Sequence, residues 1–408
     1  MLGVAQSWGE AGQGPAAHVF GGGPRLPQAS AAFVNGFQIH CQEYDCVHEP
    51  AVVHPMAVIG AALTSEAEAR AVPGADYLAA LVGAVDVAAG LGVAAKSAIR
   101  FFRPATAGLF GATLGVARMR QASLETALDA LGYALAQAAG TMQAHVEGKP
   151  ALPLQVAGAA RAAVVANDLA EAGIPGPHDV MDGPYGYLPL FELDSDLAPV
   201  IEGLGRIWRV EEVSYKPFPT GRAAQGGIGL IQQLREKGAA PDQIKSLTLT
   251  APPLIQRLVG RPPRPDMTVN YARLCFAYLG AVTLRFGSVG LTHFTPEALG
   301  DPETLALAAK IRVETDGSDD PAAFTPQTAQ AVLSDGRTLL ASLDAIYGSP
   351  AAPMRDADLS AKRAECLAFG FGVLRPDLEA ALKAEIDALE AAPSAARLAW
   401  LASGLEAP

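Results

Sequence analysis

The feature of this chain that most restricts its fold is a series of alanine-rich stretches in its first half. Apolar residues recur at three- and four-residue spacing through Ala75–Ala95, Ser123–Gln143 and Val156–Ala172, a pattern that predicts helices. Because small side chains let helices approach closely, we expect a compact helical bundle. The third stretch is followed by Gly173 to Pro177, whose glycines and prolines are typical of a helix end.

The character of the sequence changes after Gly205. Alternating or β-branched stretches predict strands at 207–218, 246–255, 310–316 and 337–344. Gly221 to Lys237 has helical spacing, and helical patterns return from Asp356. We therefore predict a mainly α protein with an inserted α+β domain. The helical domain would comprise residues 1–205 and 346–408, and the α+β domain residues 206–345.

Composition limits the class of partner. The net charge is −12 and the isoelectric point is near 5.1, which argues against a nucleic acid or an anionic membrane surface. The four cysteines show neither a CxxC pair nor zinc-ligand spacing, so we interpret them as ordinary thiols in a reducing compartment. A metal site at Cys41 and Cys46 is the alternative.

No targeting or membrane-spanning segment is expected. The longest apolar stretch, Ala79 to Ala95, is interrupted by Asp86 and is rich in glycine and alanine, which favours a buried helix. The N-terminal residues lack the basic region and apolar core of a secretion signal. A cytoplasmic protein is therefore predicted.

Titratable residues are concentrated between Asn35 and Pro55, in the stretch NGFQIHCQEYDCVHEPAVVHP. Histidine and carboxylate side chains held close together can exchange the roles of acid and base. We interpret this stretch as the floor of an active site, with five candidate catalytic residues: His40, Glu43, Asp45, His48 and His54. The alternative is that His40 is a core histidine and that the others are solvated.

If residues 29–44 are helical, His40, Glu43 and Tyr44 share one face of that helix. The residues that follow would then form a loop ending at Pro55, where a new helix starts.

Two further segments offer cations. Arg103, in RFFRPATAGLFGA, stands at a helix start, where it could clamp a carboxylate or phosphate; packing of its stem on a neighbouring phenylalanine is the alternative. Lys216, Arg222 and Gln225 belong to KPFPTGRAAQGG, at the junction between the predicted domains. Binding sites prefer such clefts, although a solvated loop would also explain these charges.

The remaining candidates have a simpler interpretation. Lys149 follows a glycine in a loop, where a solvated lysine is the alternative interpretation. Tyr278 lies on an apolar helix, where core packing would explain it. His178 and His293 are assigned to structure. Neither the GxxxxGK[ST] spacing of a phosphate loop nor a GxGxxG motif with a downstream acid is present.

Taken in chain order, these segments resemble motifs of the MmgE/PrpD family, whose members include 2-methylcitrate dehydratase, cis-aconitate decarboxylase and iminodisuccinate epimerase. The first segment resembles NGxxxHxxDYDDTH…VHPS, the second GFHxT…GxFGA, and the third KPYPxC…H. Residues 157–187 and 353–368 are also similar to family segments. The similarity extends from about residue 28 onward.

The resemblance implies a mainly helical domain and a smaller α+β lid, with the site in the cleft between them, usually in a homodimer. It also implies chemistry without a metal or another cofactor on small di- or tricarboxylates. Such chemistry removes a proton next to a carboxylate, and then expels water or CO₂ or returns the proton to the opposite face.

By resemblance, Glu43 and Asp45 match family aspartates, and His48 and His54 match the loop histidines. Lys216 matches the lysine that opens the third motif, and Tyr278 corresponds to a family site tyrosine. Lys149 is a shifted candidate for a family lysine that precedes Gly158.

The departures from the family pattern bear on the mechanism. Arg103 stands where most members have a histidine, and Gln225 replaces the histidine that ends the third motif. Two potential acid–base groups are therefore missing, and Arg103 adds a permanent positive charge.

The leading hypothesis is a metal-independent lyase of the dehydratase type that acts on a 2-methylcitrate-like substrate. His54 or His48 would be the base, with the other as acid or orienting group. Arg103, Lys216 and Arg222 would hold carboxylates, and Glu43 and Asp45 would orient the histidines. The alternatives are an epimerase like iminodisuccinate epimerase, a decarboxylase, and a non-catalytic paralogue that binds a carboxylate.

Overall fold

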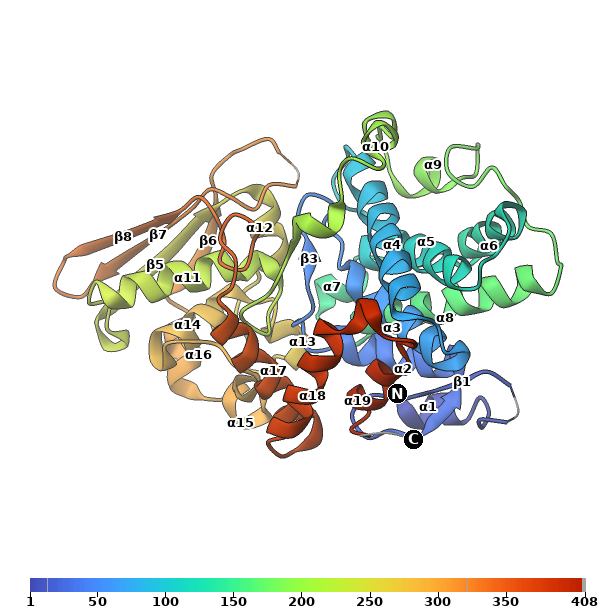
Figure 1. Ribbon diagram of the computed structural model, residues 1–408. Helices are drawn as coiled ribbons and strands as arrows, with labels where there is room; N and C mark the ends of the chain where they lie inside the picture. The colour runs from blue at the N-terminus through green and yellow to red at the C-terminus, as the bar shows by residue number, and fades with distance from the viewer. Residues whose placement is uncertain (13, 321, 406–408) are drawn as a thin grey trace.

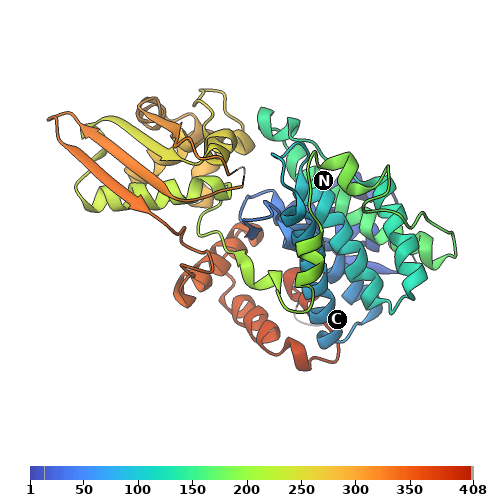
Figure 2. The same ribbon diagram turned by 90° about the horizontal axis from the view of Figure 1, so that it is seen from above.

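The structure is a computed structural model that describes residues 1–12, 14–320 and 322–405. Within this part of the chain there are 19 α-helices and eight β-strands, and helices dominate (Figure 1). A helical body, formed mainly by the first half of the chain, lies beside a body that contains the main sheet (Figures 1 and 2). The observed secondary structure is therefore mainly α with a smaller sheet-containing part, as predicted.

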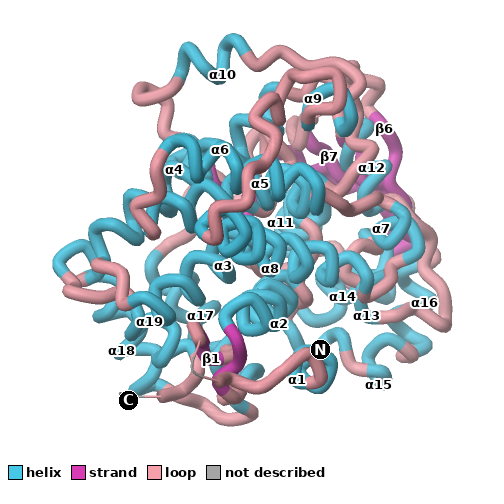
Figure 3. Tube along the Cα trace, turned by 90° about the vertical axis from the view of Figure 1, so that its right-hand side faces the viewer, coloured by secondary structure: helices cyan, strands magenta, loops and turns pink. Residues whose placement is uncertain are grey.

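The helical body begins at the N-terminus. Its helices are α1 (Leu2–Gln6), α2 (Gln28–His40), α3 (Pro55–Arg70), α4 (Gly74–Ala94), α5 (Arg103–Met119), α6 (Leu124–Gln137), α7 (Gln143–Glu147), α8 (Ala151–Glu171), α9 (Tyr187–Phe191) and α10 (Ala198–Gly203). Two small antiparallel ladders accompany them: β1 (Ala16–His18) with β2 (Arg25–Pro27), and β3 (Val47–His48) with β4 (Val213–Ser214). Figure 3 shows β1 far from the main sheet, close to both chain ends.

Small residues bring α4 and α5 into close contact. A β-carbon added to Gly111 of α5 would lie 2.3 Å from the carbonyl oxygen of Ala84 and 2.9 Å from the side chain of Ala88, both in α4. Both alanines are buried in a core that also contains Leu63 and Phe110. The glycine and alanine content that predicted a tight bundle thus sets the helix separation.

The second body is built on a four-stranded sheet in the order β6–β5–β7–β8. Its strands are β5 (Ile244–Ala251), β6 (Ile311–Thr315), β7 (Gln327–Leu333) and β8 (Thr338–Leu343). β5 is parallel to β6 and antiparallel to β7, and β7 is antiparallel to β8. Along β7, alternate side chains are buried, which gives the sheet a face for helices.

Helices cover that face. α11 (Arg222–Glu236) and α14 (Phe276–Phe286) pack against the sheet and against each other. The shorter elements of this body are α12 (Pro253–Val259), α13 (Val269–Ala272), α15 (Pro296–Leu299) and α16 (Pro302–Ala308). The buried side chains of this body form a hydrophobic core distinct from that of the helical body.

The last helices return to the helical body. They are α17 (Asp356–Phe371), α18 (Pro376–Asp387) and α19 (Ala396–Ala402), and α19 packs against α3. Figure 1 shows α17 between the two bodies. The domain boundaries after residues 205 and 345, and the role of the second body as a lid, stay predictions.

Local differences from the predictions have physical causes. The helix expected at 29–44 ends at His40, because Glu43 adopts a positive φ. Residues 207–218 form a 3₁₀ turn at Arg209–Glu212 and only the two-residue β4. β7 was not predicted, since its alanine and glutamine residues have weak β-propensity.

Among the residues that the structure describes, one helix, α4, is long and apolar enough to cross a membrane by length and composition. It overlaps the Ala79–Ala95 stretch and packs against α3 and α5, with most of its apolar window buried inside the protein. α4 therefore has the environment of a core helix.

The contact at Gly111 can be tested by adding one methyl group. Gly111→Ala forces the α5 backbone away from α4, and we expect the free energy of unfolding to fall by about 1–3 kcal/mol. The matched control is Gly83→Ala in α4, which is exposed and has no neighbouring atom within 4 Å; it should stabilise the protein by about 0.5–1 kcal/mol. Urea unfolding measures both, and a Gly111→Ala variant as stable as Gly83→Ala would contradict the close packing.

Candidate active site

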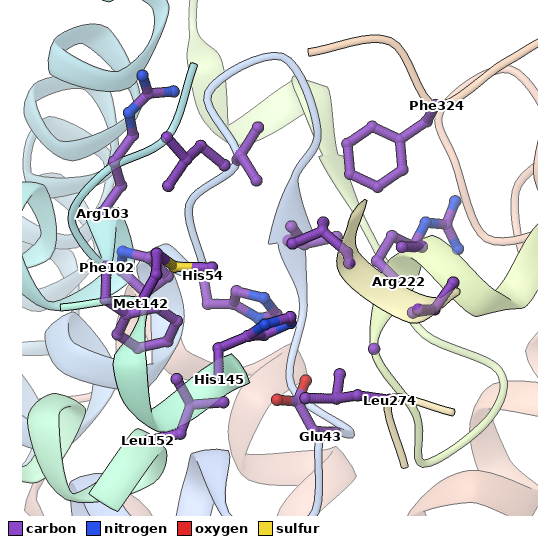
Figure 4. A pocket seen from close by; sticks show the side chains of 18 residues that line it. Glu43, His54, Phe102, Arg103, Met142, His145, Leu152, Arg222, Leu274 and Phe324 are labelled. Atoms are coloured by element: carbon purple, nitrogen blue, oxygen red, sulfur yellow. The ribbon is translucent and has the colours of Figure 1, made fainter. Parts of the chain in front are cut away.

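A small cavity lies between the helical body and the sheet-containing body (Figure 4). Its volume is about 60 Å³. His54 at the start of α3, Arg103 at the start of α5 and His145 of α7 line it from one side, whereas Arg222 of α11 and Phe324 line it from the other. Most of the remaining wall is apolar. A charged group that enters therefore loses water and depends on the few polar side chains present.

The segment after α2 brings two carboxylates back to the helix end. α2 ends at His40, and Glu43 has a left-handed backbone with a φ of 51°, a conformation that side chains with a β-carbon seldom adopt. The chain then turns so that Asp45 Oδ2 accepts a hydrogen bond from Nδ1 of His40 at 2.8 Å. A strained residue of this kind persists where its surroundings hold it in place.

His54 is held by the same carboxylate oxygen. It precedes Pro55, the first residue of α3, and its Nδ1 lies 3.1 Å from Asp45 Oδ2. An ionised carboxylate only accepts hydrogen bonds, so Nδ1 of His54 carries the ring proton. In this tautomer Nε2 carries no proton, and its lone pair is available to a molecule in the cavity. A histidine that acts as a general base needs this tautomer.

Burial and charge act differently on the two histidines. Burial alone would lower the pKa of His40, but the carboxylates of Asp45 and Glu43 outweigh it, and the pKa is raised above its ordinary value. For His54, burial together with the charge of Lys216 outweighs Asp45, and the pKa is lowered. A proton on this pair is therefore held at His40, while His54 is neutral at neutral pH.

Lys216 is the cation of this cluster. It is fully buried, and its Nζ donates to Glu43 Oε2 at 3.0 Å and lies 3.5 Å from Asp45 Oδ1. Burial would raise the pKa of Glu43, but the charges of Lys216, His40 and His54 together outweigh it and lower the pKa to about 2. The pKa of Asp45 also lies well below its usual value, because the charges of His40, His54 and Lys216 outweigh the effect of burial.

His40, Asp45 and His54 have donor atoms within 4.8 Å of one another, close enough to be considered as metal ligands. Both Nδ1 atoms, however, are engaged by a single oxygen of Asp45 at hydrogen-bond distance. The ammonium group of Lys216 already supplies the positive charge beside that carboxylate. The donor set is thus arranged for proton transfer and fits a metal ion poorly.

Two of the predicted substrate clamps line the cavity but are already paired. Arg103 forms a two-pronged ion pair with Glu192, with both N–O distances at 2.9 Å. Arg222 pairs with Glu49 at 2.7 Å and also donates to the backbone carbonyl of Tyr347. In Figure 4 the guanidinium of Arg103 points away from the histidines.

His40, Asp45 and Lys216 lie behind the cavity wall, and four other predicted site residues belong neither to the wall nor to this cluster. Nε2 of His48 is bonded to Glu212 at 2.7 Å, and its Nδ1 accepts from a backbone N–H. Gln225 of α11 donates to carbonyls of the loop that precedes this helix. Lys149 is exposed, and the Tyr278 hydroxyl donates to the carbonyl of His293. The contacts of His48, Gln225 and Tyr278 hold backbone segments together.

Sequence reasoning missed the second histidine of the cavity, His145, and its partner Arg261. Nη2 of Arg261 lies 3.2 Å from Nδ1 of His145. Nothing in the sequence marked them, because His145 is a single histidine in a five-residue helix and Arg261 follows α12, more than a hundred residues later. Glu192, the partner of Arg103, was missed for the same reason.

A half-buried lysine of α17 supports the segment between Glu43 and Asp45 from outside. Nζ of Lys362 donates to the carbonyls of Tyr44 at 2.8 Å and Lys216 at 2.9 Å. Glu365, one turn later, accepts from the hydroxyl of Tyr44 at 3.1 Å. α17 thus holds in place both the backbone of Tyr44, between the carboxylates Glu43 and Asp45, and the backbone of Lys216, their cation.

Comparison with known proteins identifies the family to which this chain is similar. The model of the MmgE/PrpD N-terminal domain matches residues 1–199, and that of the MmgE/PrpD C-terminal domain matches residues 218–389. Cis-aconitate decarboxylase of Mus musculus is 27% identical over 358 residues, which cover 83% of this chain and 71% of that protein.

Two other relatives are similar to the same extent. Cis-aconitate decarboxylase of Homo sapiens is 28% identical, over 83% of this chain and 72% of its own length. A cis-aconitate decarboxylase-like protein, oryM, of Aspergillus oryzae is 28% identical over 77% of this chain and 70% of its own length.

Removing the buried cation tests the electrostatics of the cluster. Lys216→Met leaves the carboxylates of Glu43 and Asp45 buried without their ammonium partner, and we expect the free energy of unfolding at pH 7 to fall by about 3–5 kcal/mol. Because the pKa of Glu43 is lowered from 4.5 to about 2, its pairing stabilises the fold above pH 4.5, and this stabilisation is lost as the pH falls towards 2. The difference between variant and wild type should shrink over that range.

The matched control is Lys383→Met, which breaks an exposed pair with Asp387 on α18. It should change stability little at any pH. Urea unfolding at several pH values measures both variants, and equal stability at pH 7 would contradict the assigned role of Lys216.

Proposed function

The chain belongs to the MmgE/PrpD family, and from this premise we propose that it is a lyase acting on a small di- or tricarboxylate. In the leading form of this proposal, loss of water, the reaction starts with removal of a proton from a carbon next to a carboxylate. His54 is the base, Asp45 orients it, and His40 is the buried partner that shares the carboxylate.

The observation that carries this proposal is the orientation of His54. Its Nδ1 is fixed by Asp45 at 3.1 Å, and it lines the cavity. A base must be unprotonated at the working pH and must point its lone pair at the substrate. The lowered pKa meets the first condition, and the tautomer set by Asp45 meets the second.

The leaving group divides the proposal into two reactions. Loss of water, as in a dehydratase, uses His54 as a base in its neutral form. Loss of CO₂ is favoured by a different observation: the cavity wall is mainly apolar, and a carboxylate that loses its hydration is destabilised relative to departing CO₂. The names of the curated relatives also support decarboxylation as the second candidate.

The volume of the cavity supports a lid-like role for the sheet-containing body. A cavity of about 60 Å³ is small for a tricarboxylate. Separation of its walls would make room for such a substrate. Arg222 and Phe324 belong to the sheet-containing body, whereas His54 belongs to the other, so a relative movement of the two bodies would open the site.

His54→Gln tests the base. Glutamine keeps a hydrogen bond to Asp45 within reach but cannot accept a proton, so turnover should fall at least about a hundredfold. The matched control is His178→Gln, because His178 also pairs with an aspartate, Asp129, at 2.9 Å but on the surface. This control should keep wild-type turnover.

Proton NMR in D₂O with citrate, 2-methylcitrate, cis-aconitate, malate and iminodisuccinate provides the assay. A new vinyl signal with unchanged carbon number indicates loss of water, and release of CO₂ indicates decarboxylation. Exchange with inverted configuration indicates an epimerase. If no compound reacts or exchanges, the lyase proposal fails, and binding without turnover would support a carboxylate-binding paralogue.

The pH dependence separates the two roles of His54. As a base it must be neutral, so kcat/KM should fall as the pH drops through its lowered pKa, below 6.5. As a proton donor to a carbanion left by CO₂ it must be protonated, and kcat/KM should then fall as the pH rises through the same value. A profile without either limb would exclude His54 from proton transfer.

A further inference from the structure

His145 is a second imidazole in the cavity wall that the proposed proton-transfer steps do not use. It lies in α7, its side chain is buried, and it lines the same cavity as His54. Figure 4 shows both rings reaching toward the middle of the cavity. The question is which of its ring nitrogens can face a substrate, and in which protonation state.

Arg261 answers this question through its geometry. Its Nη2 lies 3.2 Å from Nδ1 of His145. A guanidinium has only donors and is always charged in proteins, so Nδ1 must accept the hydrogen bond. The ring proton of a neutral His145 is therefore on Nε2, which makes Nε2–H a donor.

The charge around His145 keeps the ring neutral. Burial, then the cations Arg261 and Arg257, lower its pKa to about 4, although Glu43 acts in the opposite direction. These are the charged groups that bear on it from α12, the residues after α12 and the loop after α2. His145 therefore cannot act as a base at Nδ1, which is occupied, or as one at Nε2, which carries the proton.

Arg261 also has a charge and a hydrogen-bond donor that are not paired within the described part of the protein. Among the described residues it makes no ion pair with a carboxylate, and its buried Nη1 has no hydrogen-bond partner. Arg103, Lys216 and Arg222 differ, since each is paired with a carboxylate of the protein. Of these four cations, Arg261 is the one whose charge is not neutralised internally.

We propose that His145, fixed by Arg261, is the oxyanion donor of this site and contacts the substrate carboxylate through Nε2–H. When the C–H bond breaks, its proton moves to Nε2 of His54. The electron pair forms a double bond to the carboxylate carbon, and negative charge develops on the carboxylate oxygen that accepts from His145. This inference rests on the proposed function, and it specifies the substrate as one whose reacting carbon bears a carboxylate.

A fixed, neutral donor backed by a cation suits this task. A donor that is already oriented needs no reorganisation as charge develops, and its effect is largest in a dry site. The apolar wall of the cavity provides such a site. The contribution should appear in the transition state more than in substrate binding, because the charge on the oxygen grows only as the proton leaves.

Two substitutions of His145 distinguish the effect of its hydrogen-bond donor from the effect of its packing. His145→Leu keeps apolar bulk and removes the donor, so kcat should fall about 100- to 1,000-fold, with a much smaller change in KM. His145→Gln keeps an N–H donor and should recover most of that loss. The control is His178→Leu on the surface, which should keep wild-type kcat.

The tautomer can be measured without any substrate. In ¹⁵N-labelled wild-type protein, the His145 ring, identified by its absence from His145→Gln, should show Nε2–H and no titration between pH 5 and 8. In Arg261→Gln the nearby positive charge is gone, so the pKa of His145 should rise toward its ordinary value.

The outcomes distinguish this inference from the proposed function. If His54→Gln is inactive while His145→Leu turns over like wild type, the lyase stands and the oxyanion donor is wrong. If the ring carries its proton on Nδ1, or titrates above pH 6 in the wild type, the inference is also overturned. If His54→Gln stays active, the proposed base fails, and the NMR tautomer still decides the His145–Arg261 pair.

Discussion

One carboxylate oxygen, Oδ2 of Asp45, is shared by two imidazoles and organises the site. His40 at the end of α2 and His54 at the start of α3 both donate to it, and Lys216, beyond β4, lies beside the other oxygen of the same group. Three segments far apart in the sequence thus meet at one buried charge. An uncompensated charge at this depth would cost several kcal/mol, so the positions of these segments depend on one another.

Much of the fold follows from local sequence signals. The alanine-rich blocks became α4, α6 and α8. Three of the predicted strand stretches correspond to strands: two contain β6 and β8, and the third overlaps β5. Periodicity and composition are properties of neighbouring residues, so they can be recognised in one sequence. The carboxylate–histidine cluster was recognised for the same reason, since His40, Asp45 and His54 lie within fifteen residues.

The ion pairs that determine which arginines can bind a substrate could not be predicted in this way. Arg103 meets Glu192 and Arg222 meets Glu49, and each pair joins residues separated by many intervening elements. A sequence shows that an arginine is present but not whether a carboxylate has already neutralised it. Arg103 and Arg222 were therefore expected to hold substrate, whereas in the fold each holds a carboxylate of the protein itself.

These pairings also bear on Arg103, which stands where the family motif that it resembles has a histidine. An arginine there cannot exchange a proton near neutral pH, and its ion pair anchors the start of α5 to the segment after α9. The chain nevertheless brings a second imidazole to the same cavity from α7. Because Arg261 fixes its tautomer, His145 offers a hydrogen-bond donor where an acid or base might otherwise stand. The transition state would then be stabilised by a fixed dipole and a remote cation, which leaves His54 as the one cavity histidine that can take up the substrate proton.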